Sequence, residues 1–193
     1  AVVHNGIIEN HEFLKKKLIK HGYEFNSLTD TEVIPHLFDK FIDEGKSFFQ
    51  AGQSVLKMIK GAFAFATIHK NFSDQMFISR NTSPLVVGIG ENFVIVGSDT
   101  RSISHLVKKI VYLEDGDYVL VNKNAITIYD KNHKPIHRNE YNVNLDFGHI
   151  SKDGYRHFME KEIFEQPSVL VNTISSLISV DNKININLSK IGT

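Results

Sequence analysis

The sequence has no cysteine and no tryptophan among its 193 residues. Without cysteine, the chain as written forms no disulfide, ligates no iron–sulfur cluster and supplies no thiol nucleophile. The sequence has 14 phenylalanines, which predict a phenylalanine-rich interior. Hydrophobic residues at 41% and charged residues at 23% are ordinary for a globular protein, so we expect one main domain with a sizeable core.

The chain also lacks a net charge, because 22 basic residues balance 22 acidic ones. No overall field attracts nucleic acid or an anionic membrane, and Lys15-Lys16-Lys17 fits the solvated face of a helix. No apolar run approaches the roughly 20 residues that span a bilayer, and the first residues lack the pattern of a signal peptide. We therefore expect no nucleic-acid partner, no membrane partner and a cytoplasmic location.

The motifs of nucleotide binding and serine hydrolysis are absent as well. The sequence contains no G-x-x-x-x-G-K-[ST], no G-x-G-x-x-G and no G-x-S-x-G. His133 and His137 have an H-x3-H spacing, but without cysteine or a carboxylate motif we interpret them as solvated turn residues. Arg80 and Asp99 flank apolar strands and are interpreted as ion-pair or capping residues. We expect neither a metal nor a cofactor.

What is present is organised around the opening stretch AVVHNGIIEN. Ala1 to Val3 predict a short strand, Asn5-Gly6 a tight turn, and Ile7 to Glu9 the approach to a helix. One interpretation of Asn5-Gly6 is turn chemistry alone, because glycine takes positive φ freely and asparagine tolerates it. The other is a pair of donors, a side-chain amide and a backbone N–H, that stabilise the oxyanion formed when a nucleophile attacks a carbonyl. The dipeptide leaves both interpretations open.

A second motif is Thr29-Asp30-Thr31-Glu32, which comes just before a run of helix-spaced apolar residues. Its Thr-x-x-Glu spacing predicts a capping box for a helix that ends near Gly45. Asp30 can be a helix-start residue, favoured there by the positive end of the helix dipole. It can also project into a cleft and bind a substrate ammonium group.

The remaining pattern predicts three helices, then a mostly antiparallel β region, then a late helix that Pro167 breaks or kinks. Small and bulky residues alternate in residues 62–69, which is typical of a strand buried between layers. The last residues are rich in Asn and Lys and are interpreted as a linker. The predicted helices are 9–20, 30–45, 47–60, 99–106 and 155–178, and the predicted strands are 1–3, 62–69, 75–80, 85–89, 93–96, 110–113, 118–121 and 126–129.

These motifs resemble the glutaminase domain of the isomerizing glutamine:fructose-6-phosphate aminotransferases, the glucosamine-6-phosphate synthases. The resemblance runs through VVHNGIIENHEFLKKKLIKHGYEFNSLTDTEVIPHL, KGAFAFATIH, ISRNTSPLVVGIGENFVIVGSD and YLEDGD. HNGIIEN and TDTEV recur across class II glutamine amidotransferases, whereas YRHFMEKEIFEQP resembles the segment that leads to the sugar-phosphate isomerase domain. The resemblance implies an α+β fold: the four-layer αββα sandwich of the N-terminal-nucleophile hydrolases, with antiparallel sheets and incomplete at its N-terminus.

The resemblance also implies a site and partners. The Asn5 side-chain amide and the Gly6 N–H would form the oxyanion hole, Gly6 would also contact the substrate, and Asp30 would bind the α-ammonium group of L-glutamine. Residues 1–150 would be the glutaminase domain without its N-terminal part, 151–178 its C-terminal helices and interdomain connector, and 179–193 a linker. The implied partner is the sugar-phosphate isomerase domain of the same protein, and the implied state of the complete protein is a homodimer.

The chain departs from this family in its missing nucleophile. In the family an N-terminal cysteine thiolate attacks the glutamine carboxamide and its own α-amine serves as base, but this chain has no cysteine. It also begins at Ala1, inside a predicted strand. We therefore expect an incomplete stretch of a longer protein, inactive by itself. Two alternatives stay open: a catalytically dead domain that binds glutamine or a partner, and an amidotransferase with a different ammonia acceptor.

Overall fold

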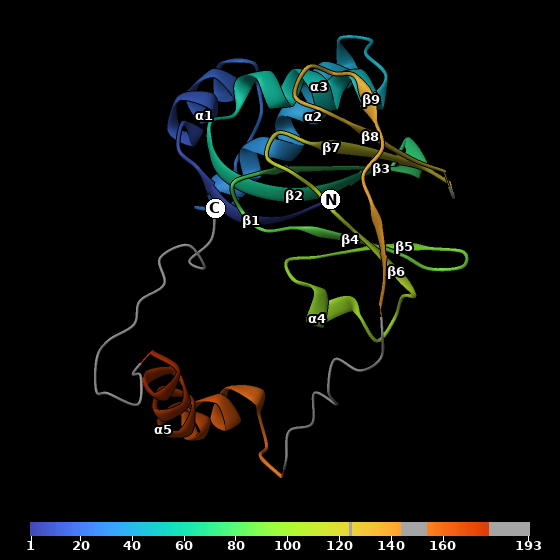
Figure 1. Cartoon of the computed structure of the whole chain (residues 1–193). Coiled ribbons are helices and arrows are strands. Elements are labelled where there is room, and N and C mark those ends of the chain that lie inside the picture. Colours follow the sequence, from blue (N-terminus) through green and yellow to red (C-terminus); the bar gives the residue numbers. More distant parts are fainter. Residues whose placement is uncertain (124, 144–153, 178–193) are drawn as a thin grey trace. The chain divides into compact units, whose positions relative to one another are not determined.

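The computed structural model describes residues 1–123, 125–143 and 154–177. The chain divides into two compact units, Ala1–Leu145 and Asp146–Thr193, each described by itself below. Two antiparallel sheets and the helices around them make up the first unit (Figure 1). Its elements are β1 (Val2–Ile8), α1 (His11–Lys20), the 3₁₀ helix η1 (Asp30–Glu32), α2 (Val33–Asp43), α3 (Phe48–Met58), β2 (Gly61–His69), β3 (Phe72–Asn81), β4 (Val86–Ile89), β5 (Val94–Gly97), α4 (Thr100–Ile103), β6 (Lys109–Tyr112), β7 (Tyr118–Asn122), β8 (Ala125–Tyr129), β9 (Pro135–Ile136) and β10 (Glu140–Asn142).

The larger sheet has six strands in the order β1-β2-β3-β7-β8-β9, and the smaller has four in the order β10-β6-β4-β5. All neighbouring strands are antiparallel, which confirms the predicted sheet type. The strands β2 to β5 were all predicted, whereas the short strands β9 and β10 were not. Among the described strands β1 pairs with β2 alone, so one of its edges is open.

The alternation in β2 shows how the sequence builds the layers. Phe63 and Phe65 pack in a core with the helices α1, α2 and α3, which cover one face of the larger sheet (Figure 1). Ala64 and Ala66 point to the other face, where a second core joins the two sheets. Successive strand residues point to opposite faces, so bulky residues meet the helices and small residues the smaller sheet. The predicted strand between layers is confirmed.

The smaller sheet repeats this alternation. Val87 and Val111 face the larger sheet, whereas Val86 and Ile110 pack against Ile103 of α4 on the outer side. The order of layers is therefore helices, sheet, sheet and a short helix. This confirms the predicted αββα sandwich, with a four-residue helix as its fourth layer in the described part.

Two predictions near the N-terminus are wrong. Asn5-Gly6 is not a turn, because β1 continues through it in unbroken register with β2, Asn5 opposite Ala64 and Gly6 opposite Phe63. The predicted capping box at Thr29 does not form, since Thr29 makes no side-chain cap and the Glu32 carboxylate accepts hydrogen bonds from the preceding loop instead. A capping box forms at the start of α3, between Ser47 and Gln50.

Gly52 lies in the interior of α3, on the buried face of that helix. A Cβ placed there would lie 2.3 Å from Cε2 of Phe77. Glycine costs a helix interior about 1 kcal/mol relative to alanine, but here it lets α3 approach the sheet until it touches a phenylalanine ring. The glycine thus serves the contact between the first two layers.

The second unit contains α5 (Phe158–Leu177), which continues through Pro167. The prediction at Pro167 was a break or a kink, and the continuous helix excludes the break. The predicted linker at 179–193 lies outside the described residues. Within the described ranges, no helix combines the length and the apolar character needed to cross a membrane.

Candidate functional site

The open edge of β1 is the first component of the site. Ala1 and Ile68 exchange two backbone hydrogen bonds, with N–O distances of 2.9 and 3.0 Å, and the Glu9 N–H donates to the Lys60 carbonyl at 2.8 Å. Because the register between these two pairs is unbroken, odd-numbered residues of β1 direct their N–H groups to β2 and even-numbered residues direct theirs away. The N–H of Gly6 therefore points to the open edge.

Asp30 is anchored on the same edge. Its Oδ2 accepts a hydrogen bond from the Ile8 N–H at 2.6 Å, while the side chain stays partly exposed. Gly6 and Ile8 are two residues apart on one strand, so their N–H groups are separated by about 6.8 Å. The structure thus brings a backbone donor and a carboxylate to one edge, although 22 residues separate Asp30 from Ile8 in sequence.

Asn5 lies on the opposite face of β1 from His4, toward the smaller sheet. Its Nδ2 donates to Oγ of Ser98, which follows β5, over 3.3 Å. Asn5 borders an open groove of about 300 Å³ between β1 and the chain around β5. The groove is lined by Val3, His4, Asn5, Ala64, Phe65, Ala66, Pro84, Leu85, Val96, Gly97 and Ser98.

Gly6 has a backbone reason to be glycine that does not depend on any function. Its φ is +131°, in a region that side chains disfavour, and a Cβ there would lie 2.1 Å from the Ala62 carbonyl oxygen. The sequence posed backbone need and oxyanion donation as alternatives. The structure shows that the backbone need is real and that it leaves the N–H on the open edge, so the two are compatible.

His4 is a neighbour that sequence reasoning missed. Its Nδ1 lies 2.9 Å from Oγ1 of Thr31, which ties β1 to η1 beside Asp30. Burial lowers the pKa of His4 below its ordinary value, and the charge of Asp30 opposes this only in part. Burial therefore favours the neutral form of the imidazole. A histidine directly before Asn-Gly carries no sequence signal for this contact, since the contact depends on the fold of residues 22 to 32.

Glu32 holds the loop that delivers Asp30. Its carboxylate accepts the N–H groups of Asn26 and Ser27, at 2.7 and 2.8 Å, and the Ser27 hydroxyl at 2.5 Å. The Ser27 hydroxyl, followed by the Asn26 N–H, lowers the pKa of Glu32 to about 2. The carboxylate is thus charged at any physiological pH, and it fixes the loop just before Asp30.

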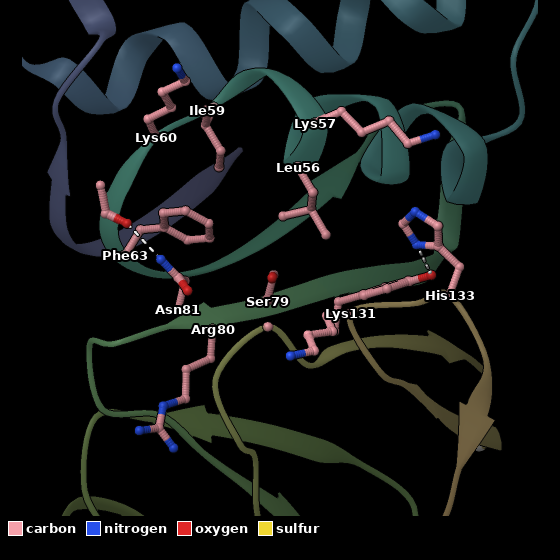
Figure 2. Close-up of a pocket in the computed structure, with 13 residues that line it drawn as sticks. Leu56, Lys57, Ile59, Lys60, Phe63, Ser79, Arg80, Asn81, Lys131 and His133 are labelled. Atoms are coloured by element: carbon pink, nitrogen blue, oxygen red, sulfur yellow. Dashed lines mark hydrogen bonds between the residues drawn. The ribbon is translucent and has the colours of Figure 1, made fainter.

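A second hollow, on the helix-covered side of the larger sheet, contains none of the predicted site residues. It measures about 310 Å³ and has several cationic side chains in its lining. Figure 2 shows that the side chains of Lys57, Lys60 and Arg80 all point away from the centre of the hollow. His133 is hydrogen-bonded to the Tyr118 hydroxyl at 2.9 Å. The polar groups do not converge, so the hollow is not the candidate site.

Arg80 and Asp99 have the structural roles predicted for them. Arg80 donates to the carbonyls of Ser83 and Leu113 and pairs with Asp115 at 3.3 Å. Asp99 caps α4 by accepting the Ser102 N–H at 2.9 Å.

Chemically, the edge of β1 offers donors for a developing negative charge and one carboxylate for a positive charge. It contains no thiol nucleophile, since the sequence has no cysteine. Within the described ranges, no group of three or more histidine or acidic side chains could hold a metal ion. The arrangement is suited to binding and polarising a substrate that another group attacks.

The fold is that of an amidotransferase sandwich of the N-terminal-nucleophile hydrolase class. The structure of glutamine phosphoribosylpyrophosphate amidotransferase from B. subtilis matches it with a TM-score of 0.55 and 24% identity, over 76% of this chain and 29% of that one. A structure described as the allosteric regulatory enzyme of purine biosynthesis matches with the same TM-score. At this identity the likeness defines the fold alone.

The sequence then places the chain within a family. Residues 1–105 match the glutamine amidotransferase domain, and the chain belongs to that family. It is 47% identical to a glutamine–fructose-6-phosphate aminotransferase (isomerizing) of Fusobacterium nucleatum, over 91% of this chain and 28% of that protein. The corresponding enzyme of Zymomonas mobilis is 43% identical over 92% of this chain and 29% of that protein. The chain thus spans less than a third of the length of these curated relatives, and the predicted resemblance is confirmed.

Proposed function

We propose that this chain is part of the glutamine-hydrolysing domain of an isomerizing glutamine:fructose-6-phosphate aminotransferase. The complete enzyme would make glucosamine-6-phosphate with ammonia released from L-glutamine. The observation that carries the proposal is the stretch of β1 from Asn5 to Ile8, which bears the Asn5 amide, the Gly6 N–H and, bound to the Ile8 N–H, the Asp30 carboxylate. The named relatives supply the acceptor, since they are aminotransferases of fructose-6-phosphate.

The roles follow from charge. A nucleophile that attacks the glutamine carboxamide turns its carbonyl oxygen into an oxyanion, and the Asn5 amide and Gly6 N–H are the donors that would stabilise it. The Asp30 carboxylate, negatively charged and partly exposed, would hold the substrate α-ammonium group. One Asp30 oxygen is bound by the Ile8 N–H, which fixes the carboxylate and leaves Oδ1 for the ligand.

The nucleophile must come from another part of the protein, because this sequence contains no cysteine. Alone, the chain would therefore bind glutamine without hydrolysing it. We further propose that residues 151–178, which include α5, connect the 1–150 domain to the sugar-phosphate isomerase domain, and that 179–193 continue as a linker. A cytoplasmic homodimer is the proposed form of the complete enzyme.

The experiment is the substitution Asn5→Ala in the complete protein, with release of glutamate from glutamine as the readout. Loss of one oxyanion donor should lower kcat by about 100- to 1,000-fold, with little change in the melting temperature because Asn5 is exposed. Near-normal turnover would show that the edge of β1 is not the oxyanion site. Wild-type protein that binds glutamine but releases no glutamate would instead favour the catalytically dead domain.

The acceptor is tested separately. Wild-type protein should convert fructose-6-phosphate and glutamine to glucosamine-6-phosphate. If glutamate is released in the presence of fructose-6-phosphate but no glucosamine-6-phosphate forms, an amidotransferase with a different acceptor is favoured.

A further inference from the structure

The Asn5 side chain is exposed on an edge strand, yet it must be held still to act as a preorganised donor. A free asparagine samples several rotamers, and ordering it during the reaction costs conformational entropy. In the described part of the chain, the Nδ2 of this side chain donates a hydrogen bond to Oγ of Ser98 over 3.3 Å. The bond joins β1 of the larger sheet to the residue that follows β5 of the smaller sheet, across 93 residues of sequence.

Ser98 itself stands on a fixed part of the backbone. The residue before it, Gly97, pairs with Val86 in the smaller sheet. A Cβ on Gly97 would lie 2.6 Å from Oγ of Ser102, which shows how closely the chain passes α4. The residue after it, Asp99, caps α4 through the Ser102 N–H at 2.9 Å and accepts the Ser102 hydroxyl at its carbonyl at 2.7 Å. The backbone that carries the Ser98 hydroxyl is therefore held from both sides.

We propose that Ser98 is a positioning residue for glutamine hydrolysis, and that its hydroxyl holds the Asn5 amide in the orientation that presents a donor to the oxyanion. This inference rests on the proposed role of Asn5. The amide nitrogen carries two hydrogens, so one N–H bonds Ser98 while the other stays free for the substrate. Asn5 and Ser98 both line the same groove of about 300 Å³, which is open to a ligand.

The inference predicts an effect on turnover rather than on binding. An interaction that matters only when the oxyanion develops changes kcat and leaves KM nearly constant. Removal of one neutral hydrogen bond corresponds to a loss of about 3- to 10-fold. Ser98→Ala in the complete protein should therefore lower kcat for glutamate release by that factor, with KM for glutamine changed by less than about twofold. Ser98→Thr keeps the hydroxyl and should retain most of the activity.

A double-substitution cycle separates this role from a structural one. If Ser98 acts through Asn5, Ser98→Ala should have no further effect on kcat once Asn5→Ala is present. Ser104→Ala is the matched control, because it removes a nearby hydroxyl that donates to the Arg101 carbonyl instead, at 3.4 Å. It should leave kcat unchanged.

The outcomes are distinguishable. Full kcat in Ser98→Ala, or the same loss from Ser98→Ala in the Asn5→Ala background, overturns the role of Ser98 while leaving the oxyanion site in place. If Asn5→Ala itself retains normal turnover, the proposed function of this edge fails and the role of Ser98 fails with it. Melting temperatures measured on every variant exclude misfolding as the cause.

Discussion

Oδ2 of Asp30 lies 2.6 Å from the backbone nitrogen of Ile8, so a carboxylate from η1 caps the open edge of β1 two residues from Gly6. A second hydrogen bond joins the same two elements, between Nδ1 of His4 and Oγ1 of Thr31 at 2.9 Å. Together these contacts set the distance between the proposed ammonium-binding carboxylate and the proposed oxyanion donors. Glutamine carries its ammonium group and its carboxamide at opposite ends, so the proposed site needs the carboxylate and the oxyanion donors to lie apart from one another.

Asp30→Asn should separate substrate binding from folding. The asparagine Oδ1 can still accept the Ile8 N–H, but the negative charge is lost. A charge-assisted hydrogen bond is worth roughly 1.5 to 3 kcal/mol, so KM for glutamine in the complete protein should rise by about 10- to 100-fold. The melting temperature should stay close to that of the wild type. An unchanged KM would falsify the role of Asp30 in binding the ammonium group.

Gly6→Ala should destabilise the fold. The positive φ alone costs about 1 to 3 kcal/mol for a residue with a side chain, and the new Cβ would collide with the Ala62 carbonyl oxygen at 2.1 Å. Gly22→Ala is the matched control, since Gly22 also has a positive φ of +88° but has open space around its Cβ position. In urea unfolding, Gly6→Ala should lose clearly more stability than Gly22→Ala. If the two variants lose the same stability, the structure relaxes around the new Cβ and the contact with the Ala62 carbonyl oxygen does not add to the cost.

Gly52→Ala tests the packing of α3 on the sheet. Helix propensity alone predicts a gain of about 1 kcal/mol from alanine, whereas a Cβ 2.3 Å from the Phe77 ring predicts a loss through overpacking, typically about 1 to 3 kcal/mol. We expect the loss to dominate, because Phe77 is fully buried and cannot move aside. Phe77→Leu combined with Gly52→Ala should recover part of it. If Gly52→Ala alone is more stable than the wild type, helix propensity outweighs the overpacking.

His4 should make the fold sensitive to mild acid. Burial lowers its pKa in the folded state below 6.5, so the unfolded chain binds the proton more readily. The stability that neutral His4 supports is present above pH 6.5 and is lost as the pH falls through the lowered pKa of the folded state. The charge of Asp30, which favours protonation, reduces the effect. Urea unfolding of the wild type and of His4→Gln at pH 7.5 and at pH 5 measures the effect. Between these pH values the free energy of unfolding of the wild type should fall by more than that of His4→Gln.

Much of this protein is determined by local sequence. The alternation of Phe63, Ala64, Phe65 and Ala66 specifies a strand between two unlike layers, because side chains of a strand alternate between faces. Helical spacing of apolar residues likewise specifies α1 to α3, and the HNG and TDTEV motifs point to Asn5, Gly6 and Asp30 before any coordinates are considered. These features depend on neighbours within a few residues, which the sequence displays directly.

Other features exist only once distant segments meet. Asn-Gly has the chemistry of a turn, yet pairing with β2 over the whole of β1 keeps it within the strand, since seven consecutive residues find partners there. Glu32 has the spacing of a helix cap, yet it binds the loop before it because that loop offers two N–H groups and a hydroxyl. The contact between Asn5 and Ser98 spans 93 residues and depends on how the two sheets stack. The sequence by itself determined which residues could form the site, and the tertiary structure decided their partners, because hydrogen bonds between sheets and loops are set by packing rather than by local pattern.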